Sequence, residues 1–198
     1  MLFRSPGWEE VRYWALDLET SGLKPREDCI LSAAVVPIRE GIIHYGEHYY
    51  SLVRPPDPAR LSTEGIRAHH ILPGELAEAP PLAAVVSALD HRIRDGVLVL
   101  HYASLDLGFL RDAYHRVGLS WGRLRVVDTV DLLLKLSHRQ QRFTPYPTPI
   151  RTALPEARAA LGLPAYVNHH ALSDALATAE LFLVLRARLC ARRLRDLC

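Results

Sequence analysis

The run Val97-Leu98-Val99-Leu100 is apolar at every position and follows Gly96. A strand with one face in water alternates apolar and polar residues, whereas a strand covered on both faces is apolar throughout. The run therefore predicts a central strand in a sheet that carries helices on both faces. That arrangement is typical of α/β proteins.

The flanking segments fit a mixed sheet of five strands. Strands one, four and five are expected to be parallel, and strand two antiparallel, because the turn at Glu40-Gly41 joins two β runs into a hairpin. The expected strands lie at about 11–19, 30–38, 42–53, 97–100 and 126–127. The expected helices lie at 82–93, 105–117, 128–136, 156–161 and 172–195. Residues 1–10 are expected to form a short leader, and 137–152 a long loop.

Composition indicates an ordinary globular protein. The chain has 198 residues, 49% of them apolar and 23% charged, which fits one domain with a core at about 11–195. The net charge of +2 identifies no partner. Three scattered cysteines, without zinc spacing, fit a reducing cytoplasm. We expect no signal peptide and no membrane span, because long apolar runs are missing.

Asp17 and Glu19 stand at the end of the first strand, two residues apart. Side chains on a strand alternate faces, so both acids point the same way, roughly 7 Å apart along the strand. Carboxylates that share one face beside apolar residues repel each other unless a cation lies between them. Mg²⁺ and Mn²⁺ prefer such oxygen ligands. For this pair alone, two surface acids are the simpler alternative.

Asp106 lies in the first turn of the helix expected at 105–117, on its apolar stripe. A first-turn acid complements the helix dipole, but that role does not explain an acid on the core-facing stripe, where an unpaired charge is unfavourable. A metal-related role and a dipole role both stay open. Because ligands bind beyond the carboxyl ends of parallel strands, Glu19 and Asp106 are expected at the same edge of the sheet.

Asp174 is an acid near the start of the last helix, and His169 precedes it by five residues. A helix-dipole partner or cap is the competing explanation for Asp174. A lone histidine is more often structural or exposed, but a histidine beside a cluster of acids is the usual general base near neutral pH. His170 is the adjacent competitor for that role.

Three stretches together resemble the DEDD superfamily of 3′–5′ exonucleases, in its histidine (DnaQ-like) branch, which includes the proofreading epsilon subunit of bacterial DNA polymerase III. Residues 16–23 (LDLETSGL) resemble the motif D-x-E-T-T/S-G. Residues 101–110 (HYASLDLGFL) resemble H-N-A-x-F-D-x-x-F-L, and residues 169–175 (HHALSDA) resemble H-x-A-x-x-D-A. Each motif alone is weak, but three in this order and at this spacing identify the family.

The resemblance implies a ribonuclease-H-like fold and a two-metal mechanism. Asp17, Glu19, Asp106 and Asp174 would hold two Mg²⁺ or Mn²⁺ ions about 3.5–4 Å apart. The five-residue spacing selects His169 over His170 as the base that takes a proton from the attacking water. By the same resemblance, the contacts to the terminal nucleotide would come from Thr20, Ser21, Gly22, Leu23, His69 and Phe109.

Two positions depart from the second motif: Tyr102 stands where the family usually has Asn, and Leu105 where it usually has Phe. Neither is a metal ligand. We therefore expect activity to survive, whereas substrate preference need not follow the epsilon subunit. Restoring Asn and Phe with no change in substrate profile would contradict this hypothesis.

The leading hypothesis is a metal-dependent 3′–5′ exonuclease acting on single-stranded or frayed DNA or RNA ends. The alternatives are a non-catalytic nucleic-acid-binding or polymerase-associated module of the same fold, and a phosphoesterase on small nucleotides. The choice between DNA and RNA depends on 2′-hydroxyl contacts that no motif reports. Association with a DNA polymerase also stays open, although no long tail is expected after the last helix to tether one.

Overall fold

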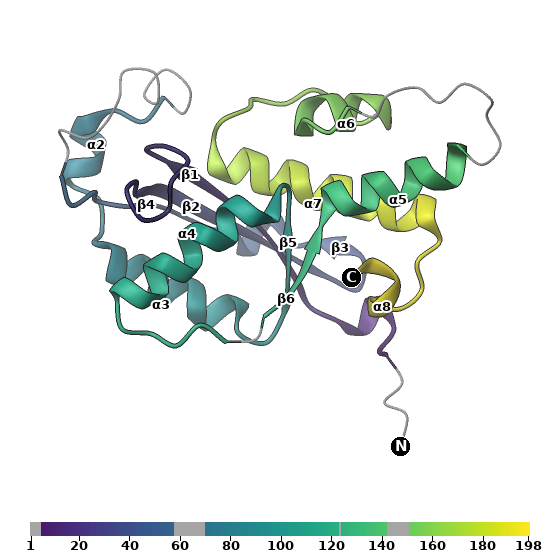
Figure 1. The fold of residues 1–198 in the computed structure, drawn as a ribbon, viewed down its shortest axis with the longest axis horizontal. Coiled ribbons are helices and arrows are strands. Elements are labelled where there is room, and N and C mark those ends of the chain that lie inside the picture. The colour runs from purple at the N-terminus through teal and green to yellow at the C-terminus, as the bar shows by residue number, and fades with distance from the viewer. Residues whose placement is uncertain (1–4, 58–69, 123, 142–150) are drawn as a thin grey trace.

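The computed structural model describes residues 5–57, 70–122, 124–141 and 151–198. It has one mixed sheet with helices on both faces (Figure 1). Within these residues the sheet has six strands, in the order β3-β2-β1-β5-β6, and β4 also pairs with β2. The strands are β1 (Tyr13–Thr20), β2 (Ile30–Arg39), β3 (Ile42–Ile43), β4 (Tyr49–Leu52), β5 (Val97–Leu100) and β6 (Arg125–Asp128).

The predicted strand directions are confirmed. β1 is antiparallel to β2 and parallel to β5, and β5 is parallel to β6. The sheet has six strands rather than five because the run expected at 42–53 is interrupted by a 3₁₀ turn at Tyr45–Glu47 (η2). Side-chain bonds stabilise this turn: His48 Nδ1 lies 2.7 Å from the Tyr45 carbonyl oxygen, and Glu47 pairs with Arg39.

Helices α3 and α4 cover one face of the sheet, and α5 and α7 cover the other (Figure 1). The 3₁₀ turn η1 (Trp8–Glu10) precedes β1. The α-helices are α2 (Pro73–Ala77), α3 (Leu82–Ile93), α4 (Ala103–Arg116), α5 (Thr129–Gln141), α6 (Leu154–Ala160), α7 (Ala171–Leu189) and α8 (Leu194–Leu197).

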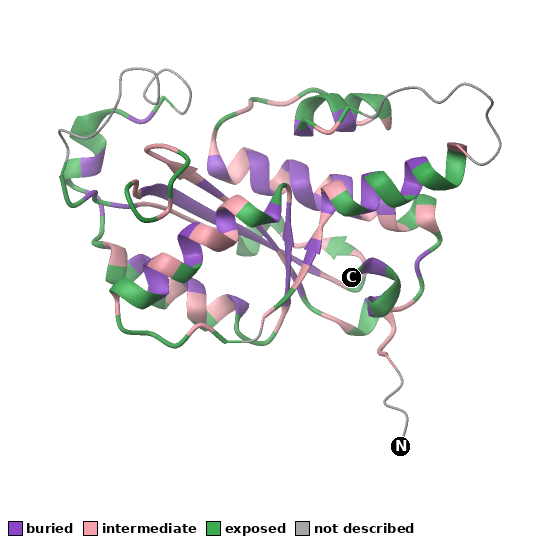
Figure 2. Ribbon diagram, viewed as in Figure 1, coloured by how far each residue is buried: buried purple, intermediate pink, exposed green. Residues whose placement is uncertain are grey.

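The central strand β5 is buried at all four positions, as its apolar sequence predicted (Figure 2). Alternate residues of β1 and β5 belong to two separate cores. The core on the α5 and α7 side contains Tyr13, Ala15, Val97 and Val99. The core on the α3 and α4 side contains Leu16, Leu18, Leu98 and Leu100. Asp17 and Glu19 continue the odd-numbered series of β1, so the alternation of the strand directs both acids to the α7 side.

Two expectations about helix ends and one about the N-terminal segment were wrong. The last helix stops at Leu189, because Cys190 adopts φ 53° and the Ala191 N–H bonds back to the Arg186 carbonyl. Residues 137–141 extend α5 instead of starting a loop, and 142–150 lie outside the described residues. The expected leader contains a buried residue, Trp8, whose ring stacks 3.8 Å from the Arg186 guanidinium carbon. None of the described helices is long and apolar enough to cross a membrane.

Candidate active site

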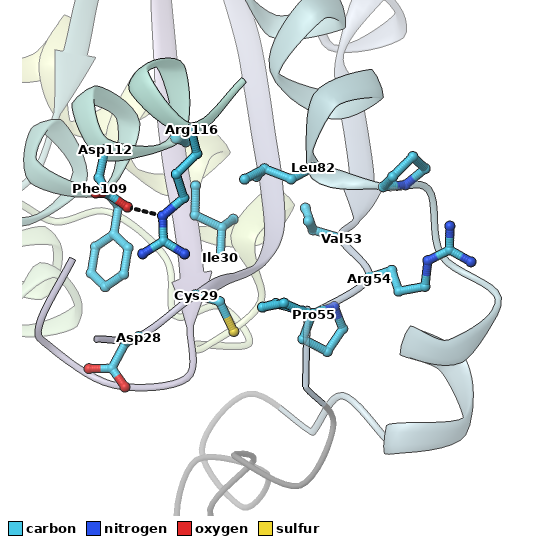
Figure 3. Close-up of a pocket in the computed structure, with 13 residues that line it drawn as sticks. Asp28, Cys29, Ile30, Val53, Arg54, Pro55, Leu82, Phe109, Asp112 and Arg116 are labelled. Atoms are coloured by element: carbon cyan, nitrogen blue, oxygen red, sulfur yellow. Dashed lines mark ion pairs between the residues drawn. The ribbon is translucent and has the colours of Figure 1, made fainter. Parts of the chain in front are cut away.

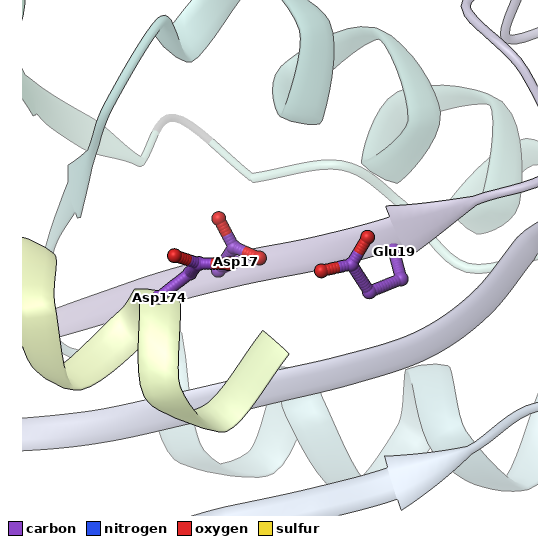
Figure 4. A group of neighbouring side chains, drawn as sticks. All are labelled: Asp17, Glu19 and Asp174. Atoms are coloured by element: carbon purple, nitrogen blue, oxygen red, sulfur yellow. The ribbon is translucent and has the colours of Figure 1, made fainter. Parts of the chain in front are cut away.

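Three of the four predicted metal ligands lie together on the α7 side of β1. Asp17 and Glu19 project from β1, and Asp174 comes from the first turn of α7 (Figure 4). One carboxylate oxygen from each of the three lies within 4.8 Å of the others. Residues more than 150 positions apart in sequence therefore meet because α7 packs across β1 on the face that both β1 acids share.

Asp174 is held in place by donors from the loop before α7. Its Oδ1 accepts a hydrogen bond from the Tyr166 hydroxyl at 2.6 Å, and its Oδ2 accepts bonds from the backbone N–H groups of His169 at 2.8 Å and His170 at 3.2 Å. Burial raises the pKa of Asp174, and these hydrogen bonds act in the opposite direction. Sequence reasoning missed Tyr166, because an irregular loop has no periodicity that links it to Asp174.

Asp106, the fourth predicted ligand, is buried in the first turn of α4, with 7% of its surface exposed. Its carboxylate is not one of the three with oxygens within 4.8 Å of one another. The group is still electrostatically part of the site, because burial and then the charge of Glu19 raise the pKa of Asp106 to about 8. A backbone hydrogen bond from Leu18 of β1 lowers this pKa in part.

Neighbouring acids raise the pKa values of Asp17, Glu19 and Asp106. Burial raises the pKa of Asp17 well above its ordinary value, and the charges of Asp106, Asp174 and Glu19 raise it further, in that order. Burial and then Asp174 raise the pKa of Glu19 to about 7. Such a cluster is unfavourable when fully ionised without a counter-charge. A hard divalent cation would supply that charge and would be held by oxygen ligands, so the residues present fit Mg²⁺ or Mn²⁺.

Asp128, at the end of β6, fixes the start of α4. Its Oδ2 accepts the Ala103 N–H at 2.8 Å, and its Oδ1 accepts the N–H groups of Tyr102 at 3.2 Å and Val130 at 2.9 Å. One carboxylate therefore caps α4 and the first turn of α5 together. The sequence placed Asp128 only at the start of the helix expected at 128–136. The Ala103 N–H that Asp128 caps lies 25 residues earlier in the chain, so sequence spacing could not indicate this contact.

We expect Asp128→Ala to lower the free energy of unfolding by about 1–2 kcal/mol, because several helix-terminal N–H groups lose their acceptor. If the acids form an active site, its activity should fall roughly tenfold or more, since the turn that carries Asp106 is no longer fixed. Urea unfolding and hydrolysis rates measure the two effects. Asp131→Ala, an exposed acid in the first turn of α5, is the matched control. Full activity in the Asp128 variant would contradict this positioning role.

His169 and His170 have different environments. His170 stacks on Tyr50 of β4, with ring centroids 4.9 Å apart, and its Nδ1 is buried without a hydrogen-bond partner in the described part of the chain. His169 is exposed, has φ 62°, and its Nε2 lies 3.2 Å from the Asn168 amide nitrogen. The charge of its ring lowers the pKa of Asp174. His169 is thus the accessible histidine of the two, and its catalytic role stays a prediction.

The predicted nucleotide contacts at 20–23 lie in a tightly bonded loop between β1 and β2. The Thr20 hydroxyl donates to the Gly22 carbonyl at 2.7 Å, and Ser21 Oγ accepts the Cys29 N–H at 3.0 Å. A Cβ at Gly22 would overlap the Asp28 carboxylate, which accepts the Lys24 N–H at 2.8 Å, so a larger residue would displace this carboxylate from its hydrogen bond. Leu23, in contrast, is 76% exposed. The loop therefore presents its backbone and Leu23, whereas both hydroxyls already have partners within the loop.

Phe109 lies one turn after Asp106 on α4 and is buried, with 2% of its surface exposed. It lines a cavity of about 460 Å³ together with Cys29, Ile30, Val53 and Leu82, and the Arg116–Asp112 ion pair lies at its border (Figure 3). The structure thus places Phe109 in the wall of a largely apolar hollow beside the β1–β2 loop. His69, the other predicted contact, lies outside the described residues.

Solved structures share this fold at low sequence identity. Exonuclease I of E. coli, in complex with a dT13 oligonucleotide, superimposes with a TM-score of 0.75 at 17% identity, over 91% of this chain and 42% of that one. Cell-death related nuclease 4 (CRN-4) superimposes with a TM-score of 0.74 at 13% identity, over 88% and 63%. These likenesses confirm the ribonuclease-H-like α/β fold.

Curated relatives include the PolC-type DNA polymerase III of Staphylococcus aureus, at 32% identity over 125 residues, and that of Staphylococcus haemolyticus, at 31% over 124 residues. Each match covers 63% of this chain but only 8% of the polymerase, so the chain corresponds to a small segment of those proteins. The family model described as exonuclease matches residues 14–182, which include the acid cluster. The chain therefore belongs to the exonuclease family.

Proposed function

We propose that the protein is a divalent-metal-dependent 3′–5′ exonuclease that releases nucleoside monophosphates from single-stranded or frayed nucleic acid. The observation that carries this proposal is the convergence of Asp17, Glu19 and Asp174 within 4.8 Å, with Asp106 buried and electrostatically linked to them. A nuclease needs to counter the negative charge that develops at the phosphate, and a held cation does so.

The four acids would hold two Mg²⁺ or Mn²⁺ ions. When bound, such ions activate a water molecule and stabilise charge on the leaving oxygen. Asp174 keeps its orientation through three hydrogen bonds, and Asp128 holds the turn that carries Asp106. His169 is exposed beside this cluster, and an imidazole nitrogen of His169 would accept the proton of the attacking water.

The terminal nucleotide would lie against the β1–β2 loop. Leu23 is exposed there and offers apolar contact to a sugar or base. Phe109 lines the adjacent apolar hollow but is only 2% exposed, so its contact is proposed from the family resemblance alone. His69 is proposed as a further contact from the family resemblance alone. The similarity to part of PolC-type DNA polymerase III favours DNA as the polymer and is the reason to test binding to a DNA polymerase.

The test is degradation of 5′-labelled single-stranded DNA and RNA oligomers with Mg²⁺, Mn²⁺ or EDTA. We expect a ladder that shortens from the 3′ end, requires a divalent ion, is blocked by a 3′-phosphate and disappears in Asp17→Ala. Asp95→Asn, which changes an exposed loop acid, is the control and should be fully active. Absence of cleavage under both metals would reject this function and favour a binding module. Hydrolysis of mononucleotide esters alone would favour a small-nucleotide phosphoesterase.

A further inference from the structure

Exposed apolar side chains occur in the same segments as the predicted catalytic residues. Leu23 follows the β1 acids and is 76% exposed, Tyr102 precedes Asp106 and is 47% exposed, and Val167 precedes His169 and is 75% exposed. Single exposed apolar side chains are normal on a protein surface, so each needs a second observation before it indicates contact with a ligand. Of these three, Tyr102 alone carries an aromatic ring on which a nucleobase could stack.

Tyr102 occupies an unusual backbone conformation. As the residue before α4, it has φ 61° and ψ 54°, the left-handed region that Asn and Gly adopt more readily than Tyr. The Asp128 carboxylate holds this backbone by accepting the N–H groups of Tyr102 and Ala103. A bulky residue held in this region is strained, and strained residues cluster at functional sites.

The side chain of Tyr102 is also held in place by two contacts, one at its hydroxyl and one at its ring. Its hydroxyl lies 2.5 Å from Thr152 Oγ1, and its ring meets that of His101 at 86°, with centroids 5.1 Å apart. His101 is itself fixed, with its two ring nitrogens each 2.7 Å from an oxygen of Thr129 or Thr152. A ring that is already ordered and still half-exposed loses little conformational entropy when a ligand stacks on it.

Two aromatic residues therefore flank Asp106 along α4: Phe109 lies about one turn after it, and Tyr102 one turn before it. With the scissile phosphate at the acids and the terminal nucleotide on the Phe109 side, the next nucleotide lies on the Tyr102 side. We propose that Tyr102 is a specificity-determining residue that stacks on the base preceding the terminal nucleotide. This inference rests on the proposed exonuclease function and adds to it a preference for unpaired ends with at least two nucleotides.

The test compares two substrates, a single-stranded DNA dodecamer and the p-nitrophenyl ester of thymidine 5′-monophosphate, which has no second base. Tyr102→Asn suits the left-handed backbone and removes the ring. We expect it to raise KM for the dodecamer roughly tenfold, with kcat and the ester reaction within about twofold of wild type. Tyr102→Phe, which keeps the ring and loses only the Thr152 bond, should stay close to wild type on both substrates.

A dodecamer with an abasic site next to its 3′ terminus tests the same contact without any variant. Wild-type KM should rise about as much as in Tyr102→Asn, and the variant should show no further rise on the abasic strand. Equal effects of Tyr102→Asn on both substrates, or no effect of the abasic site on wild type, would overturn the inference. Fluorescence-anisotropy binding in Ca²⁺ compares the affinities of the wild type and Tyr102→Asn for the normal and abasic strands without hydrolysis. A wild-type protein that hydrolyses neither substrate would contradict the proposed function instead.

Discussion

Replacing Asp17 by asparagine should abolish hydrolysis and, at the same time, raise the thermal midpoint of the metal-free protein. Asp17 is the acid with the most like-charged neighbours, since Asp106, Asp174 and Glu19 all raise its pKa. If Asp17 holds a metal ion as proposed, its loss removes charge stabilisation at the phosphate, and we expect kcat to fall roughly a thousandfold or more. Asparagine has nearly the same shape, so packing around β1 is retained.

The gain in stability has the same origin as the loss of activity. In the metal-free protein the carboxylates of the cluster repel one another, and a neutral amide at position 17 removes one of these charges. We expect a rise of a few degrees in the midpoint near pH 8 in EDTA. Adding Mg²⁺ should then raise the wild-type midpoint more than that of the variant, because only the wild type retains the full ligand set.

Calorimetry in EDTA and in Mg²⁺, together with single-turnover hydrolysis, measures these effects. Asp95→Asn makes the same chemical change in an exposed loop and should alter stability by less than about 0.5 kcal/mol. A lower midpoint for Asp17→Asn in EDTA would mean that the Asp17 carboxylate stabilises the fold. The idea of an acid cluster kept for function at the expense of stability would then be wrong.

The sheet and the meeting of the acids were predictable because both depend on strong local patterns. Apolar residues at every position of β5 and the alternation in β1 determine which face each residue occupies. The parallel order of β1 and β5 then brings the ends of these strands to one edge. The family motifs added the pairing of Asp174 with β1, which periodicity alone did not indicate.

The features that were not predicted depend on single residues or on long-range contacts. The break at η2 comes from bonds of Glu47 and His48 inside a run with β-favouring neighbours. The end of α7 comes from one left-handed residue, Cys190. Asp128 and Tyr166 form hydrogen bonds with groups that only the folded chain brings near them, so no local sequence pattern identifies either residue. The departure at Tyr102 was visible in the sequence, but its bond to Thr152 was not.

In the absence of metal, the protein should become less stable as pH rises from about 5 to above 8. The folded-state pKa is about 7 for Glu19 and about 8 for Asp106, against ordinary values of 4.5 and 3.8. An acid whose pKa is raised on folding binds its proton more tightly in the native state. Its contribution to stability is therefore complete below the unfolded-state pKa and is lost as pH rises through the folded-state pKa.

The shift at Glu19 alone corresponds to on the order of 3 kcal/mol, or a fall in the thermal midpoint of roughly 5–10 °C across this range. His101 acts in the opposite direction, because burial lowers its pKa and the neutral ring is favoured in the folded state. The contribution of the acids is thus best isolated by comparing wild type with Asp106→Asn. That variant removes the charge of one strongly shifted acid and should flatten the dependence.

Saturating Mg²⁺ should reverse the slope, since protons and the cation compete for the same carboxylates and the cation is favoured as pH rises. Thermal midpoints from pH 5 to 9, with EDTA and with Mg²⁺, for both proteins provide the measurement. Parallel curves for wild type and Asp106→Asn in EDTA would show that the acids do not govern stability in this range. A curve unchanged by Mg²⁺ would show that the cluster does not hold the ion, which would also remove the physical basis for the proposed hydrolysis.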